Sequence, residues 1–323
     1  MDRLFPRGCS ANALAVTRDE FRSGAVAIVG RPNVGKSTLM NAALDQPLAI
    51  VSSTPQTTRD ELLGVVHYKN VEMAFLDTPG LHLPRTELGK RMNASAREAT
   101  RKADVVLFVA EVPLSRSAAA LAPHPGDRVL LQGLTTDAPV VLVLNKVDRI
   151  RDKSRLLPLI EAFSKLRTFA SITPVSLLKN TEVSRILDEV ARLCPLGQWR
   201  FGDDDITDKP LRYFAREYVR EQILRSTQAE VPHASAVSID KFDETPKGDL
   251  SIDATIHVER SGQKKILVGK GAEMLKNIGI SARKRLEELA GCKVHMRLWV
   301  RVTPTWRMNP STLDELGYGH EKS

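Results

Sequence analysis

The chain has 323 residues, which is more than one average domain and suits two. Lysine and arginine (47) exceed aspartate and glutamate (39), so the formal net charge of +8 permits an anionic partner without requiring one. Three widely separated cysteines argue against a disulfide framework or a zinc site, and indicate a reducing compartment. No apolar run approaches the roughly 18 residues of a membrane span. Residues 1–23 lack the apolar core of a signal peptide, and we expect a mostly disordered extension there.

Residues 30–37 read GRPNVGKS and match the pattern G-x-x-x-x-G-K-[ST]. The apolar run 25–29 before them predicts a buried strand, and the segment 38–44 after them predicts a helix. A strand, a glycine-rich turn and a helix start direct backbone N–H groups and the positive helix dipole at one point, which binds phosphate. We expect Lys36 to reach the β- and γ-phosphates of a nucleotide and the Ser37 hydroxyl to bind Mg²⁺.

A polar loop, TPQTTR at residues 54–59, follows the predicted helix. Downstream of a phosphate-binding loop, one threonine hydroxyl closes over Mg²⁺ and the γ-phosphate and is released after hydrolysis. We prefer Thr58 to Thr57 for this role. Arg59 and Arg85 are candidates for stabilising charge during hydrolysis, but we expect both to lie in solvated loops.

A predicted strand at 71–76 delivers the motif DTPG at 77–80. Asp77 then lies where bound Mg²⁺ needs a carboxylate acceptor, and the N–H group of Gly80 is suited to the γ-phosphate. Ras-type enzymes orient the attacking water with a glutamine directly after this motif, whereas here the position is Leu81. We therefore expect slow intrinsic hydrolysis, with the water placed by backbone, by a bound monovalent cation or by a partner.

We expect the tetrapeptide NKVD at residues 145–148 to select the base of the bound nucleotide. The Asp148 carboxylate offers two acceptors to the adjacent N1–H and amino group of guanine, while adenine would leave it unpaired. The Lys146 stem is suited to lie over the base, and Asn145 to tie this loop to the phosphate-binding loop. The predicted nucleotide is GTP, with GDP as its product.

Strands and helices alternate through this half of the chain. Apolar strands are predicted at 105–109, 140–144 and 172–176, with helices at about 126–134 and at 183–193. This order predicts an α/β fold, a P-loop domain with a mostly parallel sheet and helices on both faces. We assign the domain to residues 24–196, followed by a polar linker at 197–210, a second domain at 211–307 and a C-terminal tail at 308–323.

The second domain is strongly basic. Residues 260–307 hold twelve lysines and arginines against three acids, an excess of nine that is larger than the net +8 of the whole chain. After an amphipathic helix from 211 and strands at 235–242 and 250–259, the small-residue turn GKGA at 269–272 precedes a long helix and a strand. In that helix we expect a buried stripe that leaves four basic side chains outward: Lys276, Arg283, Lys284 and Arg285.

A turn without side-chain bulk beside cations lets a sugar-phosphate backbone approach, as in KH domains bound to single-stranded RNA. The alternative is a basic, solvated helix face that ends in a glycine turn. The order helix, strand, strand, turn, helix, strand favours an α+β KH domain. The residues we expect to contact RNA are Lys264, Lys265, Gly269, Lys270, Gly271, Lys276 and Arg283.

Together the motifs resemble those of the bacterial Era family of GTPases, a Ras-like GTPase domain joined to a C-terminal type II KH domain. The resemblance covers the chain from about residue 24 to the end. It implies binding of the 3′ end of small-subunit ribosomal RNA, a role in maturing the small ribosomal subunit, and an RNA uptake governed by the bound nucleotide. It rests on residues 30–38, 56–59, 77–82, 145–148, 205–208, 262–265, 278–280, 298–300 and 316–318.

The resemblance also implies a cytoplasmic protein that, in some members, associates peripherally with the inner face of the cell membrane, and we expect a monomer. Asn33 resembles a potassium ligand of related GTPases. The nucleotide-binding residues implied are Gly30, Asn33, Val34, Gly35, Lys36, Ser37, Thr38, Asp77, Gly80, Asn145, Lys146, Asp148, Ser176 and Leu177. Ser37, Thr58 and Asp77 surround Mg²⁺, and Lys36, Thr58 and Gly80 act in hydrolysis.

Three positions depart from the family pattern. Leu177 follows Ser176 where the family has alanine, in a contact commonly made by the backbone N–H group. Ala272 stands where the KH turn has glycine, and its methyl group would crowd a phosphate. The segment 111–126 also looks unlike the family.

Two functions remain open from the sequence. In the first, the protein is a hydrolysing switch that releases RNA or the ribosome after turnover. In the second, it is an RNA-binding assembly chaperone for which GTP is a structural ligand. The missing glutamine favours the second, and the intact phosphate, metal and base motifs favour the first.

Overall fold

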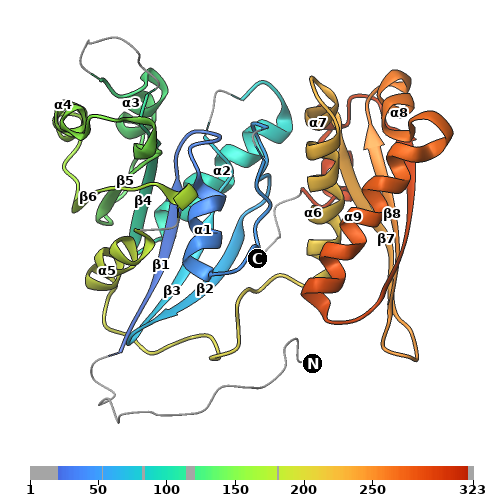
Figure 1. Ribbon diagram of the computed structural model, residues 1–323, viewed down its shortest axis with the longest axis horizontal. Coiled ribbons are helices and arrows are strands. Elements are labelled where there is room, and N and C mark those ends of the chain that lie inside the picture. The colour runs from blue at the N-terminus through green and yellow to red at the C-terminus, as the bar shows by residue number, and fades with distance from the viewer. Residues whose placement is uncertain (1–20, 53, 82–83, 114–120, 180–181, 319–323) are drawn as a thin grey trace.

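The computed structural model describes residues 21–52, 54–81, 84–113, 121–179 and 182–318. Its two domains stand next to each other, joined by one connecting segment and by direct contacts (Figure 1). Most of the predicted N-terminal extension lies outside the described residues, as does part of the segment 111–126. Among the described residues, no helix is both long and apolar enough to cross a membrane.

The first domain is built on a six-stranded sheet with the order β2-β3-β1-β4-β5-β6. All neighbouring strands are parallel except β2 and β3, so the predicted mostly parallel sheet is confirmed. The antiparallel edge strand β2 was not predicted. The strands are β1 (Arg22–Val29), β2 (Leu62–Tyr68), β3 (Val71–Asp77), β4 (Val105–Glu111), β5 (Val140–Asn145) and β6 (Ser171–Pro174).

Strand β1 begins earlier than expected. Arg22 and Ser23, which we had assigned to the extension, pair with β3 in the sheet. The Ser23 hydroxyl donates to the buried Glu72 carboxylate at 2.8 Å, and the Arg22 guanidinium donates to the Cys194 carbonyl at 2.6 Å. The domain therefore starts before residue 24.

Helices cover both faces of this sheet, because side chains alternate between the faces along each strand. Val26 and Ile28 of β1 share a core with α1 and α5, whereas Ala27 and Val29 share one with α2, α3 and α4. The helices are α1 (Lys36–Leu44), α2 (Glu87–Lys102), α3 (Pro125–Gln132), α4 (Leu156–Ser164) and α5 (Val183–Leu193). The carboxyl ends of β1, β3, β4 and β5 lie at one edge, where the sequence motifs follow.

The second domain has a three-stranded sheet, β7-β8-β9, with β7 antiparallel and β9 parallel to β8. Helices α6 and α9 pack on each other and on this sheet (Figure 1). The sequence missed α8, where Gln263 accepts from two backbone N–H groups at the helix start. The elements are α6 (Leu211–Ser226), α7 (Val231–Ala234), β7 (Ala236–Glu244), β8 (Leu250–Val258), α8 (Ser261–Val268), α9 (Glu273–Ala290), β9 (Val294–Val302) and α10 (Pro310–Glu315).

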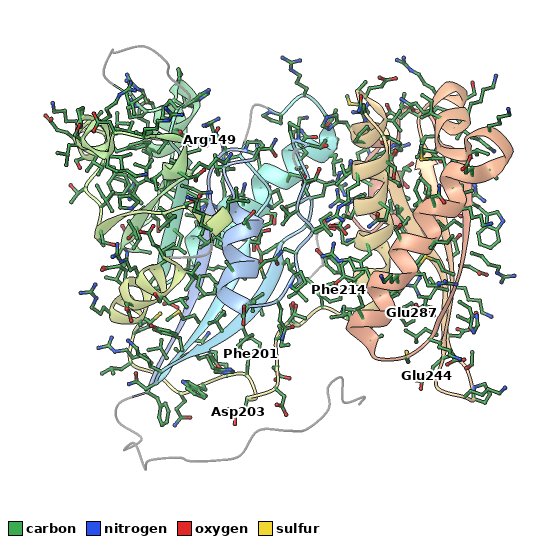
Figure 2. All side chains as sticks on the ribbon, viewed as in Figure 1. Arg149, Phe201, Asp203, Phe214, Glu244 and Glu287 are labelled. Atoms are coloured by element: carbon green, nitrogen blue, oxygen red, sulfur yellow. The ribbon has the colours of Figure 1, made fainter. Side chains whose placement is uncertain are left out.

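The segment that joins the domains runs along the edge of the first sheet, and Figure 2 labels Phe201 and Asp203 on it. The Glu72 carboxylate of β3 accepts the N–H groups of Arg200 and Phe201 at 2.9 Å. The Thr207 hydroxyl donates to the Leu63 carbonyl of β2 at 2.7 Å. The connecting segment is thus attached to the sheet rather than free.

The C-terminal segment packs between the domains. Leu313, Leu316 and Tyr318 form a small core with Trp306 of the second domain and with Leu88 and Met92 of α2. The expected tail is therefore a structural element as far as Tyr318. One of the four basic side chains expected to face outward on α9 is also placed differently, because Arg285 pairs with the buried Glu221 of α6 and stacks 4.3 Å from the ring centre of Tyr218.

Candidate functional site

A cavity of about 590 Å³ opens at the carboxyl edge of the first sheet. Most of the predicted nucleotide-binding residues line it, but Gly30, Val34, Asp77 and Ser176 lie buried behind its walls. Arg149 and the apolar side chains of Ile50, Val51 and Leu178 also line the cavity, and no sequence motif pointed to them. The predicted residues on the wall are Asn33, Gly35, Lys36, Ser37, Thr38, Thr58, Gly80, Asn145, Lys146, Asp148 and Leu177.

The phosphate-binding turn needs glycine at two positions. Gly30 has a φ of 149°, and a Cβ atom there would lie 2.3 Å from the Val109 carbonyl oxygen. Gly35 has a φ of 109°, in the left-handed range that side chains disfavour. Together they let the backbone turn sharply into α1, so that the start of this helix lies at the cavity, an arrangement suited to binding phosphate.

Three oxygen-bearing side chains meet beside this turn. The Ser37 hydroxyl donates to Asp77 Oδ2 at 2.6 Å and lies 2.9 Å from the Thr58 hydroxyl, which is 3.2 Å from the same carboxylate oxygen. The other Asp77 oxygen is buried and has no hydrogen-bond partner. Hydroxyl and carboxylate oxygens are what Mg²⁺ prefers, so this cluster fits that ion. The Thr57 hydroxyl instead donates to the Thr54 carbonyl at 2.6 Å.

Burial dominates the electrostatics of the cluster. It lowers the pKa of Lys36 to about 8, an effect that the nearby Asp77 carboxylate opposes. Burial likewise raises the pKa of Asp77, against the opposing influence of Lys36 and of the hydroxyl hydrogen bonds. Burial disfavours the charged form of each group. A bound phosphate would compensate the charge of Lys36, and a bound divalent cation would compensate the charge of Asp77.

The loop predicted to select the base, residues 145–148, is held by Asn145. Its amide nitrogen donates to the Val34 carbonyl at 2.8 Å, and its amide oxygen accepts the N–H group of Leu177 at 3.1 Å. This contact uses the backbone of residue 177, so it does not depend on which side chain stands there. The Ser176 hydroxyl donates to Asp148 at 2.6 Å and lowers the pKa of that exposed carboxyl group, which keeps it ionised as a double acceptor.

An ion-pair cluster that the sequence did not predict supports the phosphate-binding turn. The Arg31 guanidinium donates to Asp127 Oδ1 at 2.8 Å, and Asp127 is fully buried at the start of α3. Glu111, at the end of β4, lies 3.6 Å from Arg31 and also pairs with Lys146. These contacts tie the turn to the strand and helix next to the base-selecting loop.

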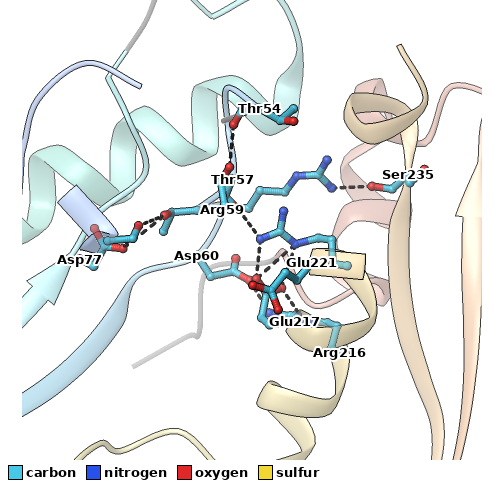
Figure 3. Close-up of polar contacts among 12 residues, drawn as sticks. Thr54, Thr57, Arg59, Asp60, Asp77, Arg216, Glu217, Glu221 and Ser235 are labelled. Atoms are coloured by element: carbon cyan, nitrogen blue, oxygen red, sulfur yellow. Dashed lines mark hydrogen bonds and ion pairs between the residues drawn. The ribbon is translucent and has the colours of Figure 1, made fainter. Parts of the chain in front are cut away.

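The prediction that Arg59 lies in a solvated loop is wrong. Its side chain is 4 % exposed and points into the second domain, where it donates to the Ser235 carbonyl at 2.6 Å (Figure 3). Arg85 is exposed, as expected. The residue directly after the candidate Mg²⁺ ligand Thr58 is therefore part of the contact between the domains.

The second domain carries a groove of about 300 Å³ between α9 and β9. Its floor is apolar, with Leu275, Ile280 and Leu298, and its rim carries the cations Lys276 and Arg283. A Cβ atom on Gly279 would lie 3.3 Å from Leu298, so glycine keeps the groove open. The other predicted RNA-binding lysines, Lys264, Lys265 and Lys270, are exposed on α8 and the turn, near Gly269 and Gly271.

The GKGA turn is made from residues with positive φ. Gly269 (φ 72°), Gly271 (φ 58°) and Ala272 (φ 62°) all lie in the range that favours glycine. No atom outside the chain neighbours lies within 4 Å of a Cβ built on Gly271, so only its backbone requires glycine. Ala272 adopts the same backbone with a methyl group, which costs about 1 kcal/mol.

Comparison with known proteins agrees with both halves of this description. Residues 25–146 match the family of 50S ribosome-binding GTPases, and residues 230–307 match the KH domain family. GTPase Era of Lactobacillus helveticus is 42 % identical over 300 residues, 93 % of this chain and 97 % of that protein. GTPase Era of Geotalea uraniireducens is 42 % identical over 304 residues, 94 % of this chain and all of that protein.

Two solved structures are similar along almost the whole chain. A crystal structure of Era in complex with MgGDPNP and nucleotides 1506–1542 of 16S ribosomal RNA has a TM-score of 0.87 at 36 % identity. A variant of Aquifex aeolicus Era bound to GDP and AlF4⁻ has a TM-score of 0.86 at 36 % identity. Each comparison covers 93 % of this chain and 100 % of the other. The chain belongs to the Era family of GTPases.

Proposed function

We propose that the protein is a GTP-hydrolysing switch that binds the 3′ end of small-subunit ribosomal RNA and assists maturation of the small ribosomal subunit. The observation that carries the proposal is the combination of a guanine-nucleotide site with a basic KH groove in one chain. A similar protein, 36 % identical, holds MgGDPNP and nucleotides 1506–1542 of 16S ribosomal RNA in one complex.

Hydrolysis here would rest on positioning rather than on covalent chemistry. The backbone of the turn 30–37 cradles the phosphates, and Lys36 neutralises charge on the transferred group. Ser37, Thr58 and Asp77 would hold Mg²⁺, which would neutralise phosphate charge when bound. A Cβ atom on Gly80 would lie 2.8 Å from the Pro32 nitrogen, so this glycine brings the strand end against the turn and its N–H group near the γ-phosphate.

The attacking water has no glutamine to orient it, because Leu81 occupies that position. The Leu81 N–H group donates to the Gly30 carbonyl at 3.2 Å, which fixes the backbone beside the phosphate site. We propose that the water is oriented by backbone groups or by K⁺ bound near Asn33. Intrinsic hydrolysis is then slow, and the rate becomes sensitive to a partner that orders this region.

RNA would bind as a single strand across the second domain. Its phosphates would approach the turn 269–272 and the exposed lysines, and its bases would enter the apolar groove beside Gly279. Because the proposed RNA belongs to the small ribosomal subunit, we also propose a cytoplasmic location. We further propose that the acting species is a monomer.

An assembly chaperone with GTP as a structural ligand is the second candidate, favoured by Leu81. Multiple-turnover GTP hydrolysis, measured with and without a single-stranded RNA that matches the small-subunit 3′ end, separates the two. The switch predicts turnover that RNA changes. If RNA leaves hydrolysis and GDP release unchanged, and a hydrolysis-deficient variant still supports subunit maturation, the chaperone is the correct function.

A further inference from the structure

The guanidinium group of Arg59 is inserted into a socket of the second domain. It donates to the carbonyl oxygens of Ser235 at 2.6 Å and Pro232 at 3.1 Å, and to the Tyr318 hydroxyl at 3.4 Å. Its central carbon lies 5.7 Å from the ring centre of Trp306 and 6.0 Å from that of Tyr318. We call Pro232, Ser235, Trp306 and Tyr318 the arginine socket.

The socket is held in shape by contacts within the second domain and its C-terminal segment. The Trp306 indole donates to the Ala234 carbonyl at 2.8 Å, and its ring stacks on Tyr318 with ring centres 6.0 Å apart. The Ser235 hydroxyl donates to the Val231 carbonyl at 2.6 Å. Because these contacts do not use Arg59, the aromatic rings and carbonyl oxygens form a site matched to a planar cation.

A second arginine crosses the interface in the opposite direction. Arg220 on α6 is fully buried, is held by Glu217, and donates to the carbonyl oxygen of Thr57. Asp60 forms an ion pair with Arg216, also on α6. The loop that precedes β2 is thus attached to the second domain on both sides of residue 58.

Thr58 lies between these attachments, but its side chain points into the nucleotide site rather than toward the second domain. Its hydroxyl is 2.9 Å from Ser37 and 3.2 Å from Asp77 in the nucleotide site. Consecutive Cα atoms are about 3.8 Å apart, so Thr58 cannot leave the site by several ångströms without displacing Thr57 or Arg59. In P-loop GTPases the corresponding loop is ordered by the γ-phosphate and released after hydrolysis.

We propose that the arginine socket is the sensor through which the second domain reads the nucleotide. Arg59 occupies the socket when Thr58 is closed over Mg²⁺ and the γ-phosphate, and it leaves when the loop opens with GDP. Arg59 and Arg220 are accordingly positioning residues for Thr58. This inference rests on the proposed function, because it names the contact that links nucleotide state to RNA uptake. By thermodynamic reciprocity, RNA that favours the docked arrangement also favours closed Thr58.

The same interface offers a matched control. Arg91 on α2 also joins the two domains, since it donates to the Tyr318 carbonyl at 2.9 Å and to Asp314 at 2.5 Å. It is the same type of side chain in the same interface. Its hydrogen bond to the arginine socket goes to the backbone carbonyl of Tyr318 and not to a group that contacts Arg59, and none of the hydrogen bonds or ion pairs described for it involves residues 57–60. Arg91→Ala therefore weakens domain contact without disconnecting Thr58.

The experiment measures RNA affinity of the full chain with GDP and with a non-hydrolysable GTP analogue, at fixed salt. The RNA is a short single strand that matches the small-subunit 3′ end. The quantity compared is the ratio of the affinity with the GTP analogue to the affinity with GDP, first in the wild-type protein. The variants are Arg59→Ala, Arg59→Lys, Tyr318→Phe and Arg91→Ala. We expect Arg59→Ala to lower the ratio about tenfold or to unity, as loss of charge-assisted hydrogen bonds predicts, while affinity with GDP stays unchanged.

The variants divide the contributions of the socket. Arg59→Lys keeps the charge but loses the planar fork, so an intermediate ratio is expected. Tyr318→Phe keeps the ring and loses only a long hydrogen bond of 3.4 Å, so the ratio stays near that of the wild type. Arg91→Ala also keeps the wild-type ratio. An Arg59→Ala protein with the wild-type ratio, or an Arg91→Ala protein with the same loss, overturns the socket as sensor.

A readout without RNA keeps the proposal separate from the proposed function. Amide hydrogen exchange of residues 54–61 should be slow with the GTP analogue in the wild type and in Arg91→Ala, and fast in Arg59→Ala. Unchanged protection in Arg59→Ala contradicts the socket. If the wild-type chain binds no RNA in either state, the proposed RNA function fails, and the exchange experiment still decides whether the socket holds the loop.

Discussion

Gly35 lies against the side chain of Asn145, so closely that a Cβ atom on Gly35 would be 2.4 Å from the Asn145 amide nitrogen. That nitrogen donates to the Val34 carbonyl at 2.8 Å, one residue before Gly35 in the turn. The phosphate-binding turn and the base-selecting loop therefore share one contact. A ligand that spans phosphates and base depends on both.

Gly35→Ala should abolish nucleotide binding. The new methyl group overlaps Asn145, and the φ of 109° is strained for alanine, so both loops are displaced. Titration with a fluorescent GDP derivative measures the loss, which we expect to exceed about a hundredfold from a displacement costing roughly 3 kcal/mol. Gly133→Ala is the control, because a Cβ there makes only ordinary contacts, the closest at 3.4 Å. Retained affinity in Gly35→Ala would contradict the account of the turn.

Asp148→Asn should change the preferred base. Xanthine carries an oxygen where guanine carries the amino group, and the asparagine amide donates where the carboxylate only accepts. We expect GTP affinity to fall by about a hundredfold or more and XTP affinity to rise, as for a site that rejects an unpaired polar group. Titration with each nucleotide measures the two affinities, and loss of both would show that Asp148 supports folding instead.

Ala272→Gly should stabilise the second domain and strengthen RNA binding. Glycine relieves the backbone at φ 62° and removes the methyl group at the end of the turn, so we expect a gain of about 1 kcal/mol. Gly271→Ala is the matched opposite, because open space surrounds that position and only φ opposes the side chain. Thermal unfolding should show a higher midpoint temperature for Ala272→Gly and a lower one for Gly271→Ala than for the wild type. Equal shifts would contradict the assignment of strain to the left-handed backbone.

The second domain should lose stability as the pH falls below about 6.5. Burial, with a contribution from Arg301, lowers the pKa of His257, whose ring nitrogens lie 3.0 Å from the Ser238 hydroxyl and 2.9 Å from the Thr303 hydroxyl, while Asp240 opposes the shift. The unfolded chain then binds a proton that the folded chain does not, so stability is full above the ordinary pKa and declines below it.

His257→Gln should remove this component, which is at most about 1.4 kcal/mol per pH unit. Thermal unfolding at pH 7.5 and 5.5 measures it, as the difference in pH dependence between variant and wild type. His295→Gln is the control, because the His295 side chain is 68 % exposed. An identical pH dependence in His257→Gln and the wild type would exclude the histidine as the cause.

The sequence predicted which residues lie at one edge of the sheet where local pattern and chain order coincide. Residues 30–35 form a turn between a strand and a helix, Asp77 ends one buried strand and Asp148 follows another, so local pattern and parallel topology bring them to one edge. The choice of Thr58 over Thr57 agrees with the direction of the two hydroxyls, although the Mg²⁺ role remains a proposal.

The same reasoning failed for groups whose partners are distant in the chain. Arg59 contacts Ser235, which is 176 residues away, and nothing near Arg59 marks it as buried. Arg285 has helical spacing typical of a solvated face, yet Glu221 on α6 pairs with it. Buried charges on α6 (Glu217, Arg220) were the available signal, because charges amid apolar helix residues indicate a polar contact between domains.

Above all, we propose a coupling between the bound guanine nucleotide and RNA binding within one chain. Its most direct test is the affinity of the wild-type protein for a short single-stranded RNA of the small-subunit 3′ end, with GDP and with a non-hydrolysable GTP analogue. Salt must be fixed, because phosphate contacts make the affinity strongly salt-dependent. We predict clearly tighter binding with the analogue. Equal affinity in the two states would contradict the switch and leave a GTPase and an RNA-binding domain that act independently.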